Sequence, residues 1–193
     1  RAVIERLLFL GEPVVALARE EQPGIHKVPL WFADIMVKAK FRGLRAQWMQ
    51  GDVTKPKTLH KAFTGAKAVV FCATSTKGDN LRDAYDAYVK DMWDDMPKSV
   101  DYQGLVNVAE ETVSHGISRL IIISAAAVSR PFRLSEVVKQ PLGPIASRRA
   151  HWKRQGELGA IAAITRSYLH GGNTTYTVVR PVNMGDSEWQ LSF

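Results

Sequence analysis

The segment 100–129 constrains the fold of this chain more than any other part of the sequence. Between Leu105 and Val113 apolar residues recur at helical spacing, which indicates a helix with one buried face. Gly116 follows at the point where such a helix would end, and the run 120–123 is then apolar on both faces of a strand. A strand of this kind is typical of the interior of a parallel sheet, so the sequence predicts an α/β fold.

Ser124 falls where this strand would end. In open parallel sheets ligands bind beyond the carboxyl ends of the strands, so a hydroxyl at this point is a candidate site residue. A serine that only turns the chain remains the alternative interpretation.

The remaining segments alternate between helical and strand patterns. Helices are predicted at 1–10, 57–63 and 147–164, and strands at 13–18, 44–49, 68–73 and 175–179. This alternation predicts a parallel sheet with helices on both faces. Two segments depart from it. Residues 20–41 suggest a connection with a short helix, and the acidic, aromatic segment 79–98 suggests a surface insertion.

Composition narrows the class of protein. The 193 residues correspond to one domain or most of one, and no apolar run is long enough to predict a transmembrane helix. The pattern of residues 1–5 is not that of a signal peptide, so none is expected in this segment. The single cysteine, Cys72, excludes an internal disulfide framework and is expected to be a packed, inert thiol in a buried strand. The five histidines show no paired ligand spacing, so no metal site is predicted; they are His26, His60, His115, His151 and His170.

The net charge of +7 is unevenly distributed. The densest basic run is 148–154, which could contact phosphate, an acidic partner or a membrane surface. A solvated helix face is the alternative. Because no nucleic-acid-binding motif accompanies the run, DNA is not an expected partner.

Six motifs occur in a fixed order along the chain. They are Gly51-Asp52-Val53, the segment 68–74, Val100-Asp101-Tyr102 with Gly104 and Asn107, the segment 120–129, the Trp-Lys-Arg-Gln-Gly-Glu run 152–157, and the Tyr-Thr-Val-Val-Arg-Pro run 176–181. Together they resemble the atypical short-chain dehydrogenase/reductase proteins of the NmrA-like, NAD(P)-binding group. The last two motifs are most similar to plastid members, such as Tic62-type proteins and photosystem assembly factors. The resemblance implies a Rossmann-type, doubly wound parallel sheet.

Members of this family begin with a strand and a Gly-rich turn that brings the backbone to a pyrophosphate at a helix N-terminus. Residues 1–8 match the helix that follows this turn, and the family continues beyond the last strand matched here. We therefore expect residues 1–193 to be a partial NAD(P)-binding domain, truncated at both ends, in which the first strand and the glycine turn are absent.

The resemblance also implies which residues bind a dinucleotide. They are Arg19, Asp52, Val53, Ala73, Thr74, Ser124, Lys153, Pro181 and Val182. Arg19 closes the second strand of the family, where an acid would hold the ribose hydroxyls of NAD and an arginine suits the 2′-phosphate of NADP. NADP is therefore the expected cofactor, with a surface arginine as the alternative interpretation of Arg19.

Three of the family's four catalytic positions are matched, by Asn107, Ser124 and Lys153. The fourth is a tyrosine four residues before the lysine, and Arg149 stands in its place. Arginine stays protonated at any working pH and cannot exchange a proton with a carbonyl substrate. The resemblance thus implies cofactor binding without ordinary carbonyl reduction.

Three functions remain open at this point. The first is a regulatory, assembly or structural subunit of a larger complex, such as a photosynthetic one, contacted through Tyr85, Tyr88 and Trp93. The second is an NADP-dependent reductase with a non-standard proton donor, and the third is a plastid RNA-binding relative. The expected location is the chloroplast stroma or the thylakoid surface, by peripheral association with a membrane complex; the cytoplasm and the mitochondrial matrix are the alternatives.

Overall fold

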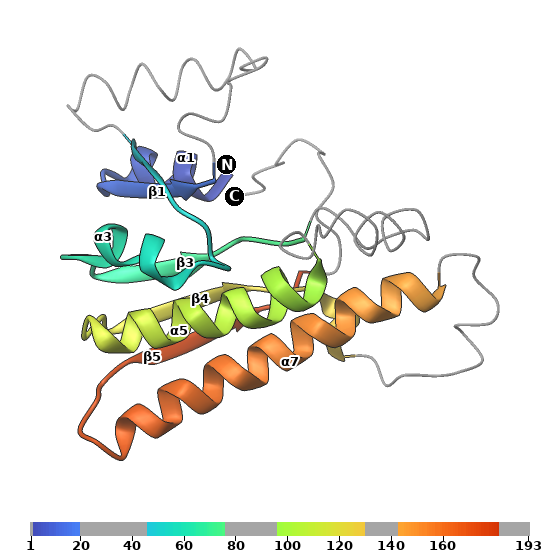
Figure 1. Cartoon of the computed structure of the whole chain (residues 1–193). Helices are drawn as coiled ribbons and strands as arrows, with labels where there is room; N and C mark the ends of the chain where they lie inside the picture. Colours follow the sequence, from blue (N-terminus) through green and yellow to red (C-terminus); the bar gives the residue numbers. More distant parts are fainter. Residues whose placement is uncertain (1, 20–45, 76–95, 130–142, 182–193) are drawn as a thin grey trace, which may run out of the picture. The chain divides into compact units, whose positions relative to one another are not determined.

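A computed structural model describes residues 2–19, 46–75, 96–129 and 143–181. The chain divides into two compact units, residues 1–64 and 65–193, and each is described by itself. Both units are built on parallel strands. The predicted α/β class with parallel pairing is therefore confirmed (Figure 1).

The first unit contains helix α1 (Ala2–Leu10), strands β1 (Val14–Ala18) and β2 (Ala46–Gln50), the short 3-10 helix η1 (Pro56–Thr58) and helix α3 (His60–Phe63). β1 and β2 pair in parallel along their whole length. The predicted helix over 57–63 is thus divided into η1 and α3. Among the described residues of this unit, the buried apolar ones are Leu8, Ala16, Leu59 and Phe63.

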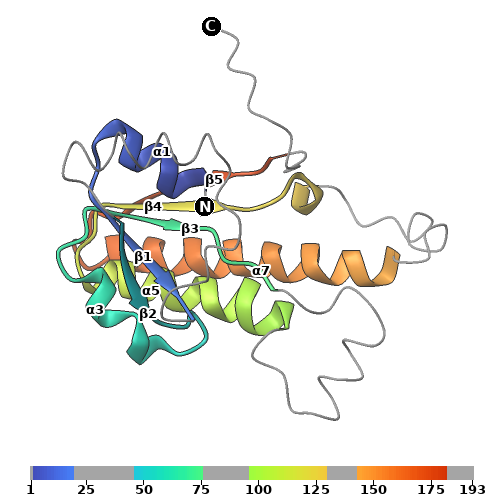
Figure 2. The same ribbon diagram turned by 90° about the horizontal axis from the view of Figure 1, so that it is seen from above.

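The second unit is organised around a three-stranded parallel sheet. Its strands are β3 (Ala68–Phe71), β4 (Arg119–Ile123) and β5 (Thr175–Val179), in the order β3-β4-β5. β4 lies between the other two, with Leu120 and Ile122 buried, which confirms the central strand predicted from its apolar run. Helices α5 (Leu105–Ser114) and α7 (Gly143–Tyr168) cover one face of this sheet (Figure 1 and Figure 2).

The helix predicted before Gly116 forms, but its first part is wider than an α-helix. Lys98–Gly104 is a π-helical segment, η3, and α5 continues from it at Leu105. Lys98, the last residue of the proposed insertion 79–98, is the first residue of this segment. Gly116 ends the helix with a φ of 62°, a conformation that glycine adopts without steric cost.

α7 is longer than the predicted helix 147–164. It includes Pro144 in its first turn, where a proline costs no intrahelical hydrogen bond. Its two internal glycines, Gly156 and Gly159, face the preceding helical layer. A Cβ on Gly156 would overlap the backbone carbonyl oxygen of Asp101, and one on Gly159 would lie 2.6 Å from a methyl of Val106. The glycines therefore allow α7 to pack closely on η3 and α5.

Hydrogen bonds at the amino-terminal edge of the sheet hold the three strands in register. The Ser118 hydroxyl donates to the Lys67 carbonyl at 3.2 Å, and the Thr175 N–H donates to the Ser118 carbonyl at 2.8 Å. The buried hydroxyl of Thr174 donates to the Ile117 carbonyl at 2.8 Å.

The strand predicted over 68–73 ends at Phe71, and this changes the position of the cysteine. Cys72 is exposed, so the prediction of a buried, packed thiol is wrong. Although the residue reaches the surface, surrounding protein atoms desolvate its sulfur and raise the pKa of the thiol. Among the described helices, none combines the length and the apolar character that crossing a membrane requires.

Candidate functional site

Residues of the candidate site follow all three strands of the second unit at the carboxyl edge of its sheet. Thr74 and Ser75 come after β3, Ser124 follows β4 directly, and Pro181 comes after β5. Since the strands are parallel, these residues gather at one edge, which is where open α/β sheets bind ligands.

The carboxylate of Asp101 is the centre of the contacts at this edge. It comes from η3, and the residue is only 1% exposed. Its Oδ1 accepts a hydrogen bond from the Thr74 hydroxyl at 3.0 Å and lies 2.8 Å from Lys153 Nζ. Its Oδ2 accepts from the backbone N–H of Ser75 at 3.2 Å. A buried charge needs such compensation, and here the compensation joins the loop after β3 to α7.

Two buried hydroxyls at the same edge have no hydrogen-bond partner among the described residues. They belong to Ser75, which is 2% exposed, and Ser124, which is 3% exposed. The backbone N–H of Ser124 donates to the Val179 carbonyl at 2.8 Å. A buried polar group without a partner costs free energy, and a bound ligand with oxygen or nitrogen atoms would satisfy it.

The three residues expected to be catalytic have different surroundings. Lys153 is tied to Asp101 and, through it, to Thr74. Ser124 adjoins the end of β5. Asn107 is buried in α5, where its Oδ1 accepts from Gln103 Nε2 at 3.0 Å. The structure thus links Lys153 with the loop after β3.

Arg149 lies about one turn before Lys153 on α7, as the sequence spacing indicated. Two aromatic residues lie close to this part of α7. Tyr102 comes from η3, not α7, and stacks on Trp152 with ring centroids 5.9 Å apart. Lys98 Nζ lies 5.7 Å from the centre of the Trp152 ring.

A second ion pair fixes the chain where β5 ends. Arg180 donates to the buried carboxylate of Glu157 through Nη2 at 2.6 Å and Nε at 3.2 Å, and through Nη1 to Ser129 Oγ at 3.0 Å. Ser129 is in the short helix η4 (Ala126–Ser129). The hydrogen bond to Glu157 raises the pKa of Arg180, and desolvation opposes this only in part. The pair holds the segment that leads into Pro181.

In the first unit, the expected cofactor residues also follow two paired strands. Arg19 is exposed after β1, and its carbonyl accepts a hydrogen bond from Gln50 Nε2 of β2 at 3.2 Å. The Asp52 carboxylate accepts from the N–H and hydroxyl of Thr54 at 2.9 and 2.8 Å, so it shapes the turn after β2. Val53 continues this turn. Arg19, Asp52 and Val53 thus lie at the carboxyl edge of their own sheet.

Several sequence-based expectations lie outside the described residues. These are Val182, the aromatic residues Tyr85, Tyr88 and Trp93, the histidine His26 and residues 79–95 of the proposed insertion.

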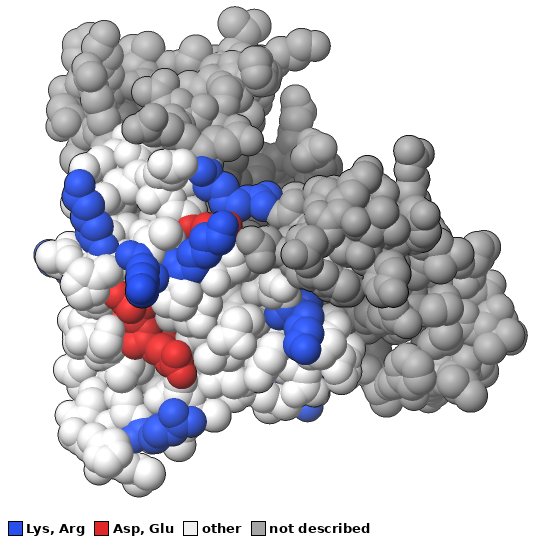
Figure 3. Space-filling model, in the orientation of Figure 1, with Lys and Arg blue, Asp and Glu red and all other residues white. Residues whose placement is uncertain are grey.

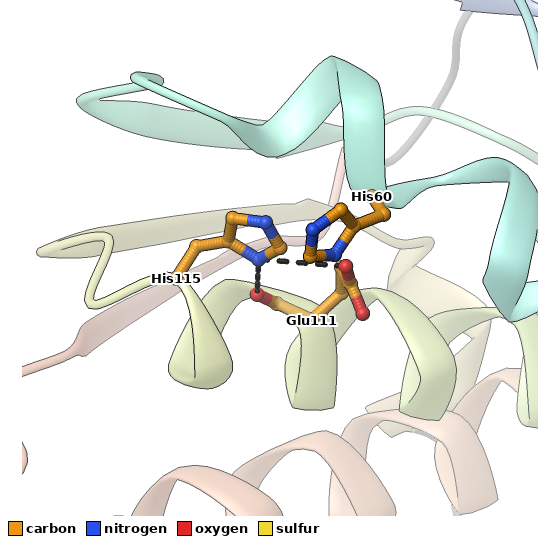
Figure 4. A group of neighbouring side chains, drawn as sticks. All are labelled: His60, Glu111 and His115. Carbon is orange, nitrogen blue, oxygen red and sulfur yellow. Dashed lines mark hydrogen bonds and ion pairs between the residues drawn. The ribbon is translucent and has the colours of Figure 1, made fainter.

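The four described histidines are at exposed or half-buried positions. Figure 4 includes Glu111 and His115 of α5, where His115 Nδ1 lies 3.4 Å from Glu111 Oε1. This is an i,i+4 pair on the helix surface.

The basic side chains that are visible over α5 and α7 stand apart from one another (Figure 3).

Sequence reasoning missed Asp101 and Ser75 as site residues. Asp101 was noticed only as part of a motif. The available signal was a carboxylate close to the apolar helix face that includes Leu105, since a charged residue near a buried face needs a partner.

A model of the NAD(P)H-binding family matches residues 1–190 of the chain. No curated protein sequence matches it. Three solved structures with a similar fold illustrate the likeness. The first is a protein from Bacillus halodurans assigned by its description to the NAD-dependent epimerases/dehydratases, with 19% identity and a TM-score of 0.57, over 97% of this chain and 69% of that one.

The second is an alcohol dehydrogenase from the archaeon Thermococcus sibiricus in complex with 5-hydroxy-NADP, with 14% identity and a TM-score of 0.57, over 94% of this chain and 70% of that one. The third is the Bordetella bronchiseptica enzyme WbmG in complex with NAD, with 18% identity and a TM-score of 0.56. That match covers 92% of this chain but 47% of WbmG, so the chain spans about half the length of that enzyme. At these identities the likeness shows a shared Rossmann-like fold.

Proposed function

The chain belongs to the NAD(P)H-binding family, and from this premise we propose that it binds NADP as a regulatory or structural subunit of a larger complex. The observation that carries the proposal is Arg149, which stands one turn before Lys153 where the resembling reductases have a tyrosine. A site that keeps its binding groups but not its proton donor is suited to hold a dinucleotide without rapid turnover.

The residues of the second unit fit one part of such a cofactor. The unpartnered hydroxyls of Ser75 and Ser124 would gain hydrogen bonds from ribose or carboxamide groups. The ammonium group of Lys153 has three donors, of which one is directed to Asp101, so it can also donate to a ligand oxygen. When bound, the nicotinamide ring would supply hydride-transfer chemistry.

The residues of the first unit that would hold the adenosine end are Arg19, Asp52 and Val53. NADP is favoured over NAD because the exposed Arg19 can donate charge-assisted hydrogen bonds to a 2′-phosphate, and no acid occupies its position.

The larger complex is proposed from the resemblance to plastid proteins, with a photosynthetic assembly at the stromal or thylakoid surface as its setting. Aromatic residues are enriched in interface cores, which makes Tyr85, Tyr88 and Trp93 the proposed contacts. Affinity purification with these three residues replaced by serine tests the contact: recovery of the same partners by a folded variant would reject it.

A second candidate function is an NADP-dependent reductase with another proton donor. Two observations favour it: the hydroxyl of Ser124 is buried without a partner among the described residues, and Lys153 is retained with its ammonium group 2.8 Å from Asp101. In this case a water molecule or a substrate group would have to transfer the proton.

The test compares the full protein with two variants. NADPH and NADH are first titrated by calorimetry, and a panel of aldehydes and ketones is then offered with NADPH. We expect the unchanged protein to bind NADPH but not to oxidise it at a substantial rate with any carbonyl compound. The Arg149→Tyr variant should gain carbonyl-dependent NADPH oxidation. Arg154→Tyr is the matched control, since it adds the same phenol at an exposed position of α7. Reduction of a carbonyl at ordinary enzyme rates by the unchanged protein would establish the second candidate instead.

A further inference from the structure

We propose that Asp101 is a positioning residue of this site, which holds Lys153 and the Thr74–Ser75 loop in the arrangement that receives a hydroxyl or amide group of the dinucleotide. This inference rests on the proposed function, because it concerns the binding of the same ligand.

The geometry is that of a single buried carboxylate shared between two separate segments. The Asp101 side chain is 0% exposed, and both of its oxygens are used. Lys153 and the Thr74 hydroxyl contact Oδ1, while the Ser75 N–H contacts Oδ2. Because these partners come from α7 and from the loop after β3, a change at Asp101 would release both segments at once.

The backbone around Asp101 leaves it little freedom to move. It lies in η3, and α7 packs against its carbonyl oxygen at Gly156, where there is no room for a Cβ. Because both the backbone and the side chain of Asp101 are held in place, its carboxylate is preorganised to position the groups that contact it.

The charge of the pair limits the chemistry of the ligand group. Asp101 and Lys153 lie 2.8 Å apart, so together they are close to neutral. A phosphate brought to Lys153 would also be repelled by the buried carboxylate beside it. A hydroxyl or an amide carbonyl accepts from the ammonium without that repulsion, so a ribose or carboxamide group suits the position better than a phosphate.

The hydroxyl of Ser75 is the second observation that points to a ligand. Its backbone N–H is held by Asp101, yet its side chain is buried without a partner among the described residues. Asp101 thereby fixes where this hydroxyl lies, and a ligand that reached Lys153 would be offered a second hydrogen-bonding group by the same loop.

The experiment measures the affinity of the full protein for NADPH and NADH by fluorescence titration. Asp101→Asn keeps the size of the side chain and removes its charge, and we expect it to weaken binding about tenfold to a hundredfold. Ser75→Ala should weaken binding about fivefold without lowering the melting temperature, since its hydroxyl has no partner to lose among the described residues.

Thr174→Val is the matched control for the loss of a buried polar group. Thr174 is 2% exposed and bonds the Ile117 carbonyl at the opposite edge of the sheet. It should lower the melting temperature and leave the affinity within about twofold, because it touches neither Lys153 nor the loop.

A double-mutant cycle separates positioning from general stabilisation. If Asp101 acts through Lys153, then Asp101→Asn should change the affinity much less in a Lys153→Met background than in the unchanged protein. A merely structural role would lower the affinity equally in both backgrounds, and that result would overturn the inference.

The outcomes also distinguish this inference from the proposed function. If the unchanged protein binds neither NADPH nor NADH, the proposed function is wrong and this inference falls with it. If the unchanged protein binds but a folded Asp101→Asn variant binds equally well, only this inference is wrong. Should Asp101→Asn not fold, Ser75→Ala decides, and an unchanged affinity in that variant overturns the inference.

Discussion

Gly156 of α7 lies directly against the backbone carbonyl of Asp101, with no room for a side chain between them. The approach of α7 to η3 therefore depends on the absence of a single methyl group, and the same approach brings Lys153 to the Asp101 carboxylate.

Gly156→Ala should lower the free energy of unfolding, although alanine is the better helix former. The added methyl would overlap a backbone atom that cannot rotate away, and overpacking of this kind typically costs about 1–3 kcal/mol. Gly159→Ala is the control, since its methyl would meet the side chains of Val106 and Tyr102 rather than backbone atoms, and side chains can shift. Urea denaturation of both variants checks this, and equal stability of the two would contradict it.

Arg19→Ala should weaken the binding of NADPH by roughly tenfold to a hundredfold and leave that of NADH nearly unchanged. The reason is the loss of a charge-assisted hydrogen bond to the 2′-phosphate, which only NADPH has. Calorimetric titration of both dinucleotides measures it. Lys61→Ala removes another exposed cation of the same unit and controls for net charge. If the unchanged protein bound NADH more tightly than NADPH, the role of Arg19 as the 2′-phosphate residue would be ruled out.

Arg180→Met should destabilise the second unit more than Arg180→Lys does. Methionine would leave the Glu157 carboxylate, 2% exposed, without its cation, and breaking a buried ion pair costs about 3–5 kcal/mol. Because the Arg180 side chain is 35% exposed, we expect the lower end of that range or less. Lysine retains the charge but not the two parallel hydrogen bonds. Adding Glu157→Gln to Arg180→Met should restore part of the loss in thermal denaturation.

Cys72 should react with iodoacetamide as an accessible thiol whose reactivity develops at higher pH than that of a free cysteine. Desolvation raises its pKa, so a smaller fraction is thiolate at pH 8. The same shift means that its contribution to stability is present below the ordinary thiol pKa and is lost as the pH rises through the folded value. The pH dependence of the alkylation rate measures the shift, and Cys72→Ser is the blank. If the alkylation rate rose at a lower pH than that of free cysteine, the raised pKa of Cys72 would be contradicted.

The order of helices and strands could be predicted because each apolar pattern is local. Leu120 and Ile122 are buried in the central strand, and Leu105 and Ala109 lie on the buried face of α5, as their spacing indicated. The end of a strand is less visible in sequence, because nothing in an apolar run marks where the chain leaves its neighbours. For this reason Cys72 was placed in β3 but is exposed beyond it.

The π-helical turns of η3 could not be predicted, because an apolar face at helical spacing is common to both kinds of helix. The candidate site could be predicted only in part. Lys153 was recognised from its motif, but its partner Asp101 depends on how two distant segments pack. Gly156 indicates this close packing, because there is no room for a Cβ at its position. In a sequence pattern, however, a glycine inside a helix only lowers the helix propensity.

The parallel pairing of the second unit has a consequence for the kinetics of folding. The hydrogen bonds that align its strands join residues far apart in the chain, since Ser118 is 51 residues from Lys67 and Thr175 is 57 residues from Ser118. Each pairing must therefore close a long loop before any sheet hydrogen bond compensates the lost chain entropy. The helix-turn-strand segment from α5 to β4 is local and can form first, whereas β5 can add only after α7 has returned the chain to the sheet. Such a high contact order favours slow folding, in which β5 joins the sheet after β3 and β4 have paired.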